Sequence, residues 1–439
     1  MLLEDQPALI SPIYPIRRKS DANGDYVVRV NSGTVPTPVR VKATLVDGAN
    51  DSCVGGTLSN IATVSSNLSV AVGLPAQLNF SLSQGTINIE GYDRDGATNT
   101  YTVIASDRLG NPVPEGTSIN FVTESGQVQP VRFTAIGNDG LSRATANFIS
   151  SEPRPRDGRI TILGYALGEK SFLDLNGNNQ FDTNEPFQDL ADIFLDRLYN
   201  VQYNTAANQL QPAPNSGFNS TEDQVISLTL PGASLGTCVA PQSGLLALNT
   251  SIPSRSEGVR CTVTNSTRDL RAYVRRAVQT ILSTSSASPM WGTRLPPGSY
   301  VPPGLSCPSP VTRVVGYNGD DSVITTSIYP FGSALLYGQG TSNSLSFVAS
   351  DANDYAYNPV AAGTVITAAA TSGLSVSVAG GSPVASTSSP TGARVNFKFD
   401  DTTFTGTITV TFTSPAGLGT SFSQFVGRDA APGGSIACP

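Results

Sequence analysis

The sequence predicts an all-β protein with several domains, and three observations lead to this expectation. A chain of 439 residues is longer than one hydrophobic core usually supports, so two to four domains are expected. Only 13% of the residues are charged, whereas glycine (42) and proline (31) are abundant, which favours short strands joined by many turns. Alternating apolar and polar residues recur along the chain, as expected of half-buried strands.

Charge and composition exclude several classes of function. The net charge of −7 argues against nucleic acid or an anionic membrane surface as the main partner, because both attract clusters of Lys and Arg. The chain contains no histidine, which removes the commonest general base and the Ser-His and Cys-His nucleophile pairs. We therefore expect that the protein is not an enzyme. Calcium sites and carboxylate pairs need only Asp and Glu, so they remain possible.

The five cysteines favour disulfides over a metal or redox site, because none of them lies in a CxxC pair. Cys238 and Cys261 are the nearest in sequence and are the candidate pair, although spacing alone cannot fix the connectivity. The odd number leaves one thiol over. Cys438, close to the last residue, is a candidate for a bond between chains, and a partner in a part of the protein absent from this sequence explains it equally well.

Targeting signals do not stand out in the sequence. The first twenty residues lack the basic and apolar regions of a signal peptide, and no stretch reaches the length of a membrane span. Export would then be signalled elsewhere. We expect the chain to be a fragment of a longer polypeptide or to have lost its original N-terminus.

An internal repeat is the most useful evidence for domain organisation. Residues 102–117 and 346–364 each contain an alternating strand that ends in Ala-Ser-Asp, at Asp107 and Asp351 respectively. A loop, Asn-Pro-Val and Gly-Thr follow in both, and the second copy has three extra loop residues. An Asp that bonds its own turn, a Pro that cannot donate to a sheet and a Gly at a tight turn predict a strand-loop-strand corner that occurs twice.

Other turns indicate where domains end. The segment from Ser20 to Asp25 precedes two alternating strands, and residues 137–141 occupy the corresponding place in a middle domain. Late strands with the same alternation are expected at 26–30, 39–45, 143–148, 159–163, 394–399 and 406–412. Three domain endings but only two beginnings are thus visible in the sequence.

These motifs resemble the bacterial immunoglobulin-like domains of the intimin/invasin type, which form tandem arrays in surface proteins and adhesins. The stretches from Asp107 to Thr117 and from Ser20 to Gly24 match the family pattern closely, and Asn138 to Gly140 matches loosely. The copy at Asp351 departs from it because its loop lacks Gly and Pro. The resemblance implies tandem immunoglobulin-like β-sandwiches, and because its motifs are turn chemistry it says little about function.

The expected fold class is therefore all-β, with tandem immunoglobulin-like sandwiches and a loop-rich calcium-binding insertion. Its expected parts are the C-terminal strands of an incomplete domain (1–48), a complete domain (66–170), an irregular extension (171–329), a second complete domain (330–428) and a tail (429–439). Within the extension, the segment 270–282 has apolar residues at helical spacing and many β-branched residues. It is the best helix candidate of the chain, but its β-branched content would also suit a strand, so the assignment stays open.

The sharpest local motif begins at Asp174 and predicts a calcium loop. Oxygen-bearing side chains fall at positions 1, 3, 5, 9 and 12 in the order of an EF-hand loop, and position 7 supplies a backbone carbonyl. The expected ligands are Asp174, Asn176, Asn178, Gln180, Asp182 and Glu185. Position 6 of the loop, usually Gly, is Asn179 here. Asn is tolerated at this position because it can adopt the left-handed backbone conformation. The alternative is a solvated Asn/Gly-rich loop that binds nothing; with calcium, the expected role is structural.

Two weaker motifs have ordinary alternatives. The acidic turn from Glu90 to Gly96 could ligate calcium at a domain junction, but a plain surface turn explains it as well. Trp291, Tyr300 and Tyr317 lie in or near Pro-rich sequence and could form a stacking platform for sugar, whereas packing against prolines is the commoner role of such aromatics.

Two functions are compatible with the sequence. The first is an extracellular or cell-surface structural or adhesive protein that binds copies of itself, other surface proteins, or a host or glycan ligand. Because 1–48 resembles strands without their first partners, this protein could form filaments by β-strand addition. The second is a carbohydrate-binding or carbohydrate-active module in which residues 171–329 act and the immunoglobulin-like domains are spacers.

Overall fold

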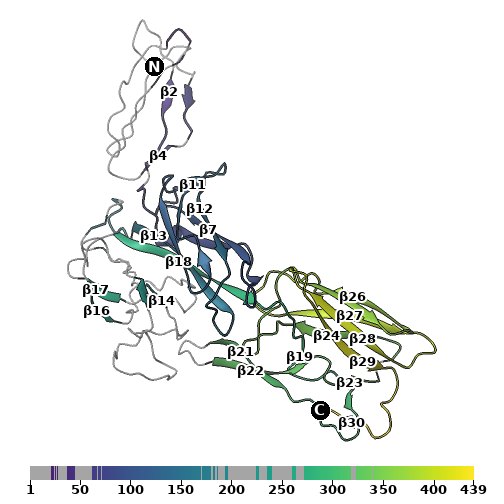
Figure 1. The fold of residues 1–439 in the computed structure, drawn as a ribbon. Coiled ribbons are helices and arrows are strands. Elements are labelled where there is room, and N and C mark those ends of the chain that lie inside the picture. The colour runs from purple at the N-terminus through teal and green to yellow at the C-terminus, as the bar shows by residue number, and fades with distance from the viewer. Residues whose placement is uncertain are drawn as a thin grey trace.

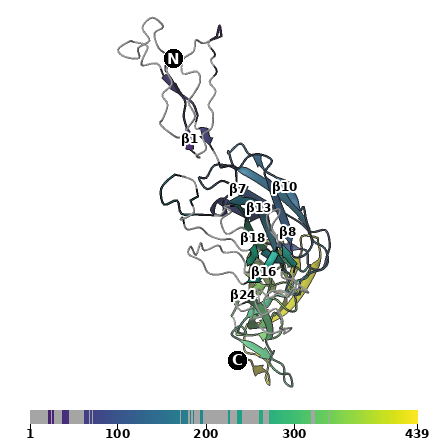
Figure 2. The ribbon, with the colours of Figure 1, turned by 90° about the vertical axis from the view of Figure 1, so that its left-hand side faces the viewer.

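The computed structural model shows a chain of β-sandwiches, and Figures 1 and 2 show the N-terminal strands, a middle sandwich and a C-terminal sandwich following one another. Within the described part of the chain no helix is long and apolar enough to span a membrane. The structure describes residues 72–169, 171–178, 181–182, 185, 271–317, 323–338 and 340–439, parts of 21–27, 37–44, 62–66 and 68–70, and four short strands between 193 and 263.

The middle domain consists of two packed sheets. Its core contains large side chains that are fully buried, including Tyr101, Phe121, Phe148 and Ile162. One sheet has the order β10 (Val131–Phe133), β8 (Ser118–Thr123), β13 (Arg159–Glu169), β18 (Arg271–Ser283) and β6 (Asn88–Glu90). The other has β11 (Ala135–Ile136), β12 (Ser142–Ile149), β7 (Thr98–Ala105) and β5 (Phe80–Gln84), and β9 (Gln127–Val128) also pairs with β12.

The segment 270–282, for which the sequence allowed a helix or a strand, forms strand β18 from Arg271 onward. It pairs antiparallel with β13 along its length, from Arg159 opposite Ile281 to Glu169 opposite Arg271. Val274 and Ile281 are fully buried by this pairing. The segment belongs to the middle sandwich, so the expected irregular extension 171–329 is wrong as a unit; residues 170–270 are inserted between two adjacent strands.

The C-terminal sandwich begins earlier than residue 330 and includes the expected tail. Its first sheet has the order β21 (Val311–Tyr317), β22 (Val323–Pro330), β19 (Met290–Gly292), β24 (Ser342–Ala349), β27 (Thr391–Phe399) and β26 (Leu374–Gly380). Its second has β25 (Val365–Ala370), β28 (Thr405–Thr413), β29 (Gly419–Gly427), β23 (Leu335–Leu336), β20 (Ser299–Val301) and β30 (Ile436–Ala437). The Pro-rich segment 295–304 therefore belongs to this domain, because it contains β20 of the second sheet and follows β19 of the first.

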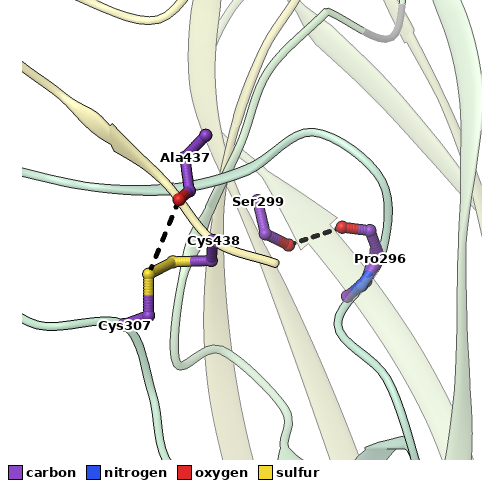
Figure 3. Close-up of a disulfide and its surroundings, with 5 residues drawn as sticks. All are labelled: Pro296, Ser299, Cys307, Ala437 and Cys438. Atoms are coloured by element: carbon purple, nitrogen blue, oxygen red, sulfur yellow. Dashed lines mark hydrogen bonds between the residues drawn. A yellow bond between two sulfur atoms is a disulfide. The ribbon is translucent and has the colours of Figure 1, made fainter.

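A disulfide joins Cys307 to Cys438, as Figure 3 shows, and closes a loop with a sequence separation of 131 residues. Beside it, β30 pairs with β20, where Tyr300 lies opposite Ala437. The expectation that Cys438 bonds another chain is thus wrong, because the last strand brings it back to the Pro-rich loop. The disulfide fastens β30 to the edge of its sheet.

The insertion contains two short strand pairs among its described residues. β14 (Ile193–Leu195) pairs with β15 (Gln224–Ile226), and β16 (Leu235–Val239) pairs with β17 (Arg260–Val263). The second pair places Cys238 directly opposite Cys261 in the backbone register. The disulfide between these two cysteines stays a prediction, because their side chains lie outside the described residues.

The described N-terminal strands form two antiparallel pairs. β1 (Thr37–Val39) pairs with β4 (Leu68–Val70), and β2 (Lys42–Thr44) pairs with β3 (Ala62–Val64). These pairs extend beyond the expected limit of residue 48. The expected strand 26–30 lies outside the described residues apart from Val27. The turn before it is present, since Asp21 Oδ1 accepts the N–H groups of Asn23 and Asp25.

Candidate calcium loop and domain junction

The side chains of the predicted calcium loop converge in the structure. Asp174 Oδ1 accepts the backbone N–H groups of Gly177, at 2.7 Å, and Asn178, at 3.2 Å. Asp182 Oδ2 accepts the side-chain amides of Asn176, at 2.7 Å, and Asn178, at 2.8 Å. Four of the six expected ligands thus lie within one hydrogen-bonded coil. Gln180 lies outside the described residues.

Glu185 closes this coil from its far end. Its Oε1 accepts the N–H of Leu175 at 2.8 Å, and its Oε2 accepts the N–H of Asp182 at 2.9 Å. Glu185 is buried, with 6% of its surface exposed, whereas Asn176 and Asn178 are exposed. The last expected ligand therefore folds back over the first residues of the loop, as a bidentate carboxylate at position 12 requires.

The donor set fits a hard cation. All the described side chains that converge here carry oxygen, and rotating the Asn176 and Asn178 amides by half a turn exchanges their Nδ2 and Oδ1 atoms. Calcium takes carboxylate and amide oxygens in this way. Among the described residues no three Asp, Glu, Cys or His side chains are already placed around a common metal position. The calcium site stays a prediction.

The loop is attached to the N-terminal end of the middle domain. Arg108 pairs with Glu169 at 3.3 Å, and its guanidinium lies 4.9 Å from the ring centre of Phe172, which in turn packs against Phe181. The N–H of Glu169 donates to the carbonyl of Pro75. Burial raises the pKa of Glu169, and Arg108 offsets part of this effect. The loop therefore lies beside the segment that leads in from the N-terminal strands.

The two repeated corners have the same structure. Asp107 Oδ2 accepts the N–H of Val72 at 3.0 Å, and Asp351 Oδ2 accepts the N–H of Thr284 at 3.0 Å. Isolated bridges, Ser106 to Pro112 and Ser350 to Pro359, close both loops. In each domain the buried Asp fixes the backbone where the chain arrives from the preceding domain. The repeat found in the sequence is thus a repeated domain connection.

Asp351 is a buried carboxylate with an unusual environment. It is 2% exposed, and burial raises its pKa to about 8, although the N–H groups of Thr284 and Asn353 and the charge of Arg159 act in the opposite direction. The charge of Asp93 adds to the upward shift. The protonated form of Asp351 is therefore favoured in the folded protein relative to an exposed Asp.

The loop after Asp351 connects the C-terminal domain to the middle domain. Asn358, fully buried, donates from Nδ2 to the carbonyl of Asp157 at 2.7 Å and accepts at Oδ1 from Arg159 Nε at 2.9 Å. The guanidinium of Arg156 lies 4.3 Å from the ring centre of Tyr355. Tyr355 lies in the loop that is three residues longer than in the first corner, and Asn358 is the Asn of the repeated Asn-Pro-Val. The longer loop therefore supplies interdomain contacts.

A second set of contacts joins the domains through β6. Asn88 donates from Nδ2 to the carbonyl of Val360 at 2.7 Å and accepts at Oδ1 from the N–H of Thr387 at 2.9 Å. Glu90 accepts from Ser414 Oγ at 3.0 Å and from the N–H of Ala416 at 2.8 Å. Glu90, the first carboxylate of the acidic turn from Glu90 to Gly96, thus binds the C-terminal domain.

Trp291 is a core residue of the C-terminal domain. It is 8% exposed, and its ring centre lies 4.4 Å from that of Phe331. Tyr300 packs edge-on against Tyr337 at 6.3 Å, and Tyr317 is the last residue of β21. The three aromatics do not form an exposed platform together, since the Trp291 ring is covered. Aromatic packing is the role that the structure gives to Trp291.

No family model matches this chain. No curated protein matches it either. Among solved structures, extracellular cadherin domains 1–4 of protocadherin gamma B7 are similar over 97% of this chain and 91% of that chain, with 10% identity and a TM-score of 0.18. The protocadherin gamma B4 extracellular domain is similar over 97% and 59%, with 9% identity and a TM-score of 0.19. Scores this low identify neither a family nor a function.

The sequence pointed to only one of the two buried asparagines that join the domains. Asn358 lies in the repeated motif and could have been found there, whereas Asn88 belongs to no motif of the sequence. Its partners Val360 and Thr387 lie 272 and 299 residues away. A buried Asn inside an apolar strand, as in Ile87-Asn88-Ile89, was the one available sign.

Proposed function

We propose that this chain is an extracellular bacterial surface protein whose tandem immunoglobulin-like domains form a stiff spacer that presents an adhesive surface. The observation that carries the proposal is the hydrogen-bonded junction between the middle and C-terminal domains. Buried amides from both domains, Asn88 and Asn358, each bond the other domain twice through their side chains. The proposal involves no catalysis.

The connection between the two domains supports a stiff rather than a hinged arrangement. Strand β18 ends at Ser283, whose Oγ donates to the carbonyl of Pro359, and the next residue, Thr284, is held by Asp351. No run of unbonded residues separates the domains at this point. A flexible linker needs several such residues, so bending here requires buried hydrogen bonds to break.

Small-angle scattering of the full chain tests stiffness. We expect the Asn88→Ala/Asn358→Ala variant to show a broader distribution of interdomain distances than the wild type, and a matched Asn396→Ala variant, changed at an exposed position, to show none. Identical curves for all three proteins would remove the spacer proposal. Accessibility to externally added protease on intact source cells tests the surface location, and complete protection would contradict it.

We further propose that the Asp174 loop binds calcium in a structural role. Bound calcium would neutralise the clustered carboxylates, and the chain's own residues Asp174, Asp182 and Glu185 would hold it. A thermal melt with and without chelator tests this: calcium should raise the midpoint, and Asp174→Ala should abolish the shift. An equal midpoint in both conditions would refute the calcium site.

Filament assembly by β-strand addition is the finer version of the proposed function. Size-exclusion chromatography with light scattering, followed by electron microscopy, tests it directly, and monomers at every concentration would exclude it. Sugar stacking on Trp291 is not proposed, because that ring is buried against Phe331.

A further inference from the structure

Strand β24 has an open backbone edge in the C-terminal domain. On one side it pairs with β27 along its whole length, from Ser342 opposite Lys398 to Ala349 opposite Thr391. On the other side, Met290 of β19 lies opposite Val348 and is the one strand partner that the described residues provide. The stretch 342–346 therefore pairs with no described strand on this side.

The backbone of Ser344 and Ser346 faces this open edge. The carbonyl of Thr341, just before β24, accepts the N–H of Phe399, the last residue of β27, so the backbone groups of the odd-numbered residues of β24 face β27. The N–H of Ser344 donates to Asn343 Oδ1 at 2.8 Å. Because successive residues of a strand alternate in direction, the N–H and C=O of Ser346 face away from β27 as well. Ser346 is exposed.

A cavity of about 710 Å³ lies along this edge and opens between the two sheets. Asn343 to Ser346 form one wall, and the segment from Pro296 to Gly298 with Tyr300 forms part of the other. The buried side chains of Leu336 and Leu345 also line it. The cavity thus combines backbone hydrogen-bonding groups with the apolar side chains of Leu336 and Leu345, and a strand that adds to a sheet edge uses both.

Two further groups indicate the chemistry of an occupant. Trp291 lines the cavity, and its buried Nε1–H has no hydrogen-bond partner among the described residues. Arg294 lines it too and is exposed, and none of the ion pairs between described residues includes it. A carbonyl-rich ligand that carries a carboxylate complements both groups.

We propose that this cavity is the docking site for an extended peptide strand of a partner protein, with apolar residues alternating around one acidic residue. The open stretch of five residues, 342–346, spans about 16 Å at about 3.3 Å per residue. The cavity volume lies within the range of about 300–1,000 Å³ that holds a compact ligand. The peptide backbone pairs with the N–H and C=O of Ser346 and with the C=O of Ser344, and the peptide's carboxylate pairs with Arg294. A glycan is the weaker match, since Phe331 covers the Trp291 ring.

Selection from a phage library of random ten-residue peptides tests the proposal, with the full-length chain as bait and its Ser346→Pro variant as counter-bait. Proline removes the N–H that faces the open edge and leaves the β24–β27 ladder intact, because that N–H does not bond β27. We expect enriched peptides with alternating apolar residues and an Asp or Glu. Absence of enrichment over the counter-bait would overturn the proposal.

The best enriched peptide is then synthesised with a fluorescent label and measured by anisotropy. Arg294→Glu should weaken its binding at least tenfold and should favour the analogue with Lys in place of the acidic residue. The control Arg132→Glu makes the same charge change on an exposed residue of the middle domain and should leave binding unchanged. Equal loss in both variants would refute a specific pairing with Arg294.

Amide hydrogen exchange on the wild-type chain keeps the test valid if Ser346→Pro fails to fold. The bound peptide should slow exchange at Ser346 by at least tenfold and leave Arg132 unaffected. Unchanged exchange at Ser346 would place the peptide elsewhere and overturn the proposal. Concentration-dependent self-association that Ser346→Pro abolishes would identify a second copy as the occupant, which also overturns it.

Discussion

Replacing Asn358 by alanine perturbs the domain junction at a fully buried side chain. The change removes two hydrogen bonds between the domains, one to the carbonyl of Asp157 and one from the guanidinium of Arg159. A hydrogen bond between neutral groups contributes about 0.5–1.5 kcal/mol, and one with a charged partner about 1.5–3 kcal/mol. The free energy of unfolding of the C-terminal domain should therefore fall by about 2–4 kcal/mol.

Urea unfolding followed by tryptophan fluorescence measures this loss. Trp291 is the only tryptophan of the chain and lies in the C-terminal core, so its fluorescence reports that domain. With a urea m value of about 2 kcal/mol per M, the midpoint should fall by about 1–2 M. The control Asn396→Ala makes the same substitution at an exposed position of the same domain.

Equal urea midpoints for Asn358→Ala and Asn396→Ala would refute this expectation. That result would mean that the two hydrogen bonds add no net stability and that water replaces them at no cost. A lower midpoint with unchanged scattering would separate stability from stiffness, because the junction would then hold its geometry through β6 alone.

Three further predictions concern other parts of the structure. The pKa of Asp351 in the folded protein, about 8, lies above the ordinary value of 3.8. The stability that Asp351 contributes is therefore fully present below pH 3.8 and is lost as the pH rises toward 8. Urea midpoints measured from about pH 4 to 9 should fall with rising pH in the wild type, and Asp351→Asn should flatten this fall. Cys307→Ser opens a loop with a sequence separation of 131 residues and should lower the stability of the C-terminal domain by about 2–5 kcal/mol, measured by calorimetry; reductant should destabilise that domain in the wild type but not in the variant. Gly168→Ala places a methyl group against the carbonyl oxygen of Pro75 and should destabilise the middle domain by about 1–3 kcal/mol. Gly392→Ala, in strand β27, meets no atom within 4 Å and has no positive φ, so it should cost less; equal losses of stability would contradict this.

Local chemistry in the sequence predicted the all-β class and the repeated corner. Asp107 and Asp351 act within their own turns, accepting N–H groups two residues ahead. Interactions of this kind depend on neighbours in the sequence, so their residue types reveal them. The convergence of Asp174, Asp182 and Glu185 is predictable for the same reason, since all three lie within twelve residues.

The tertiary structure alone decided which distant segments belong together. Residues 271–283 have a pattern that suits a helix or a strand, and they form β18 because β13 offers eleven residues of antiparallel partner. Cys307 bonds Cys438 because β20 and β30 become neighbours, and a sequence separation of 131 residues gave no sign of this pair. The sequence by itself determined turns and strand alternation, because these depend on a few consecutive residues. Strand partners, the domain junction and the cavity beside β24 depend on contacts across hundreds of residues, and only folding brings those together.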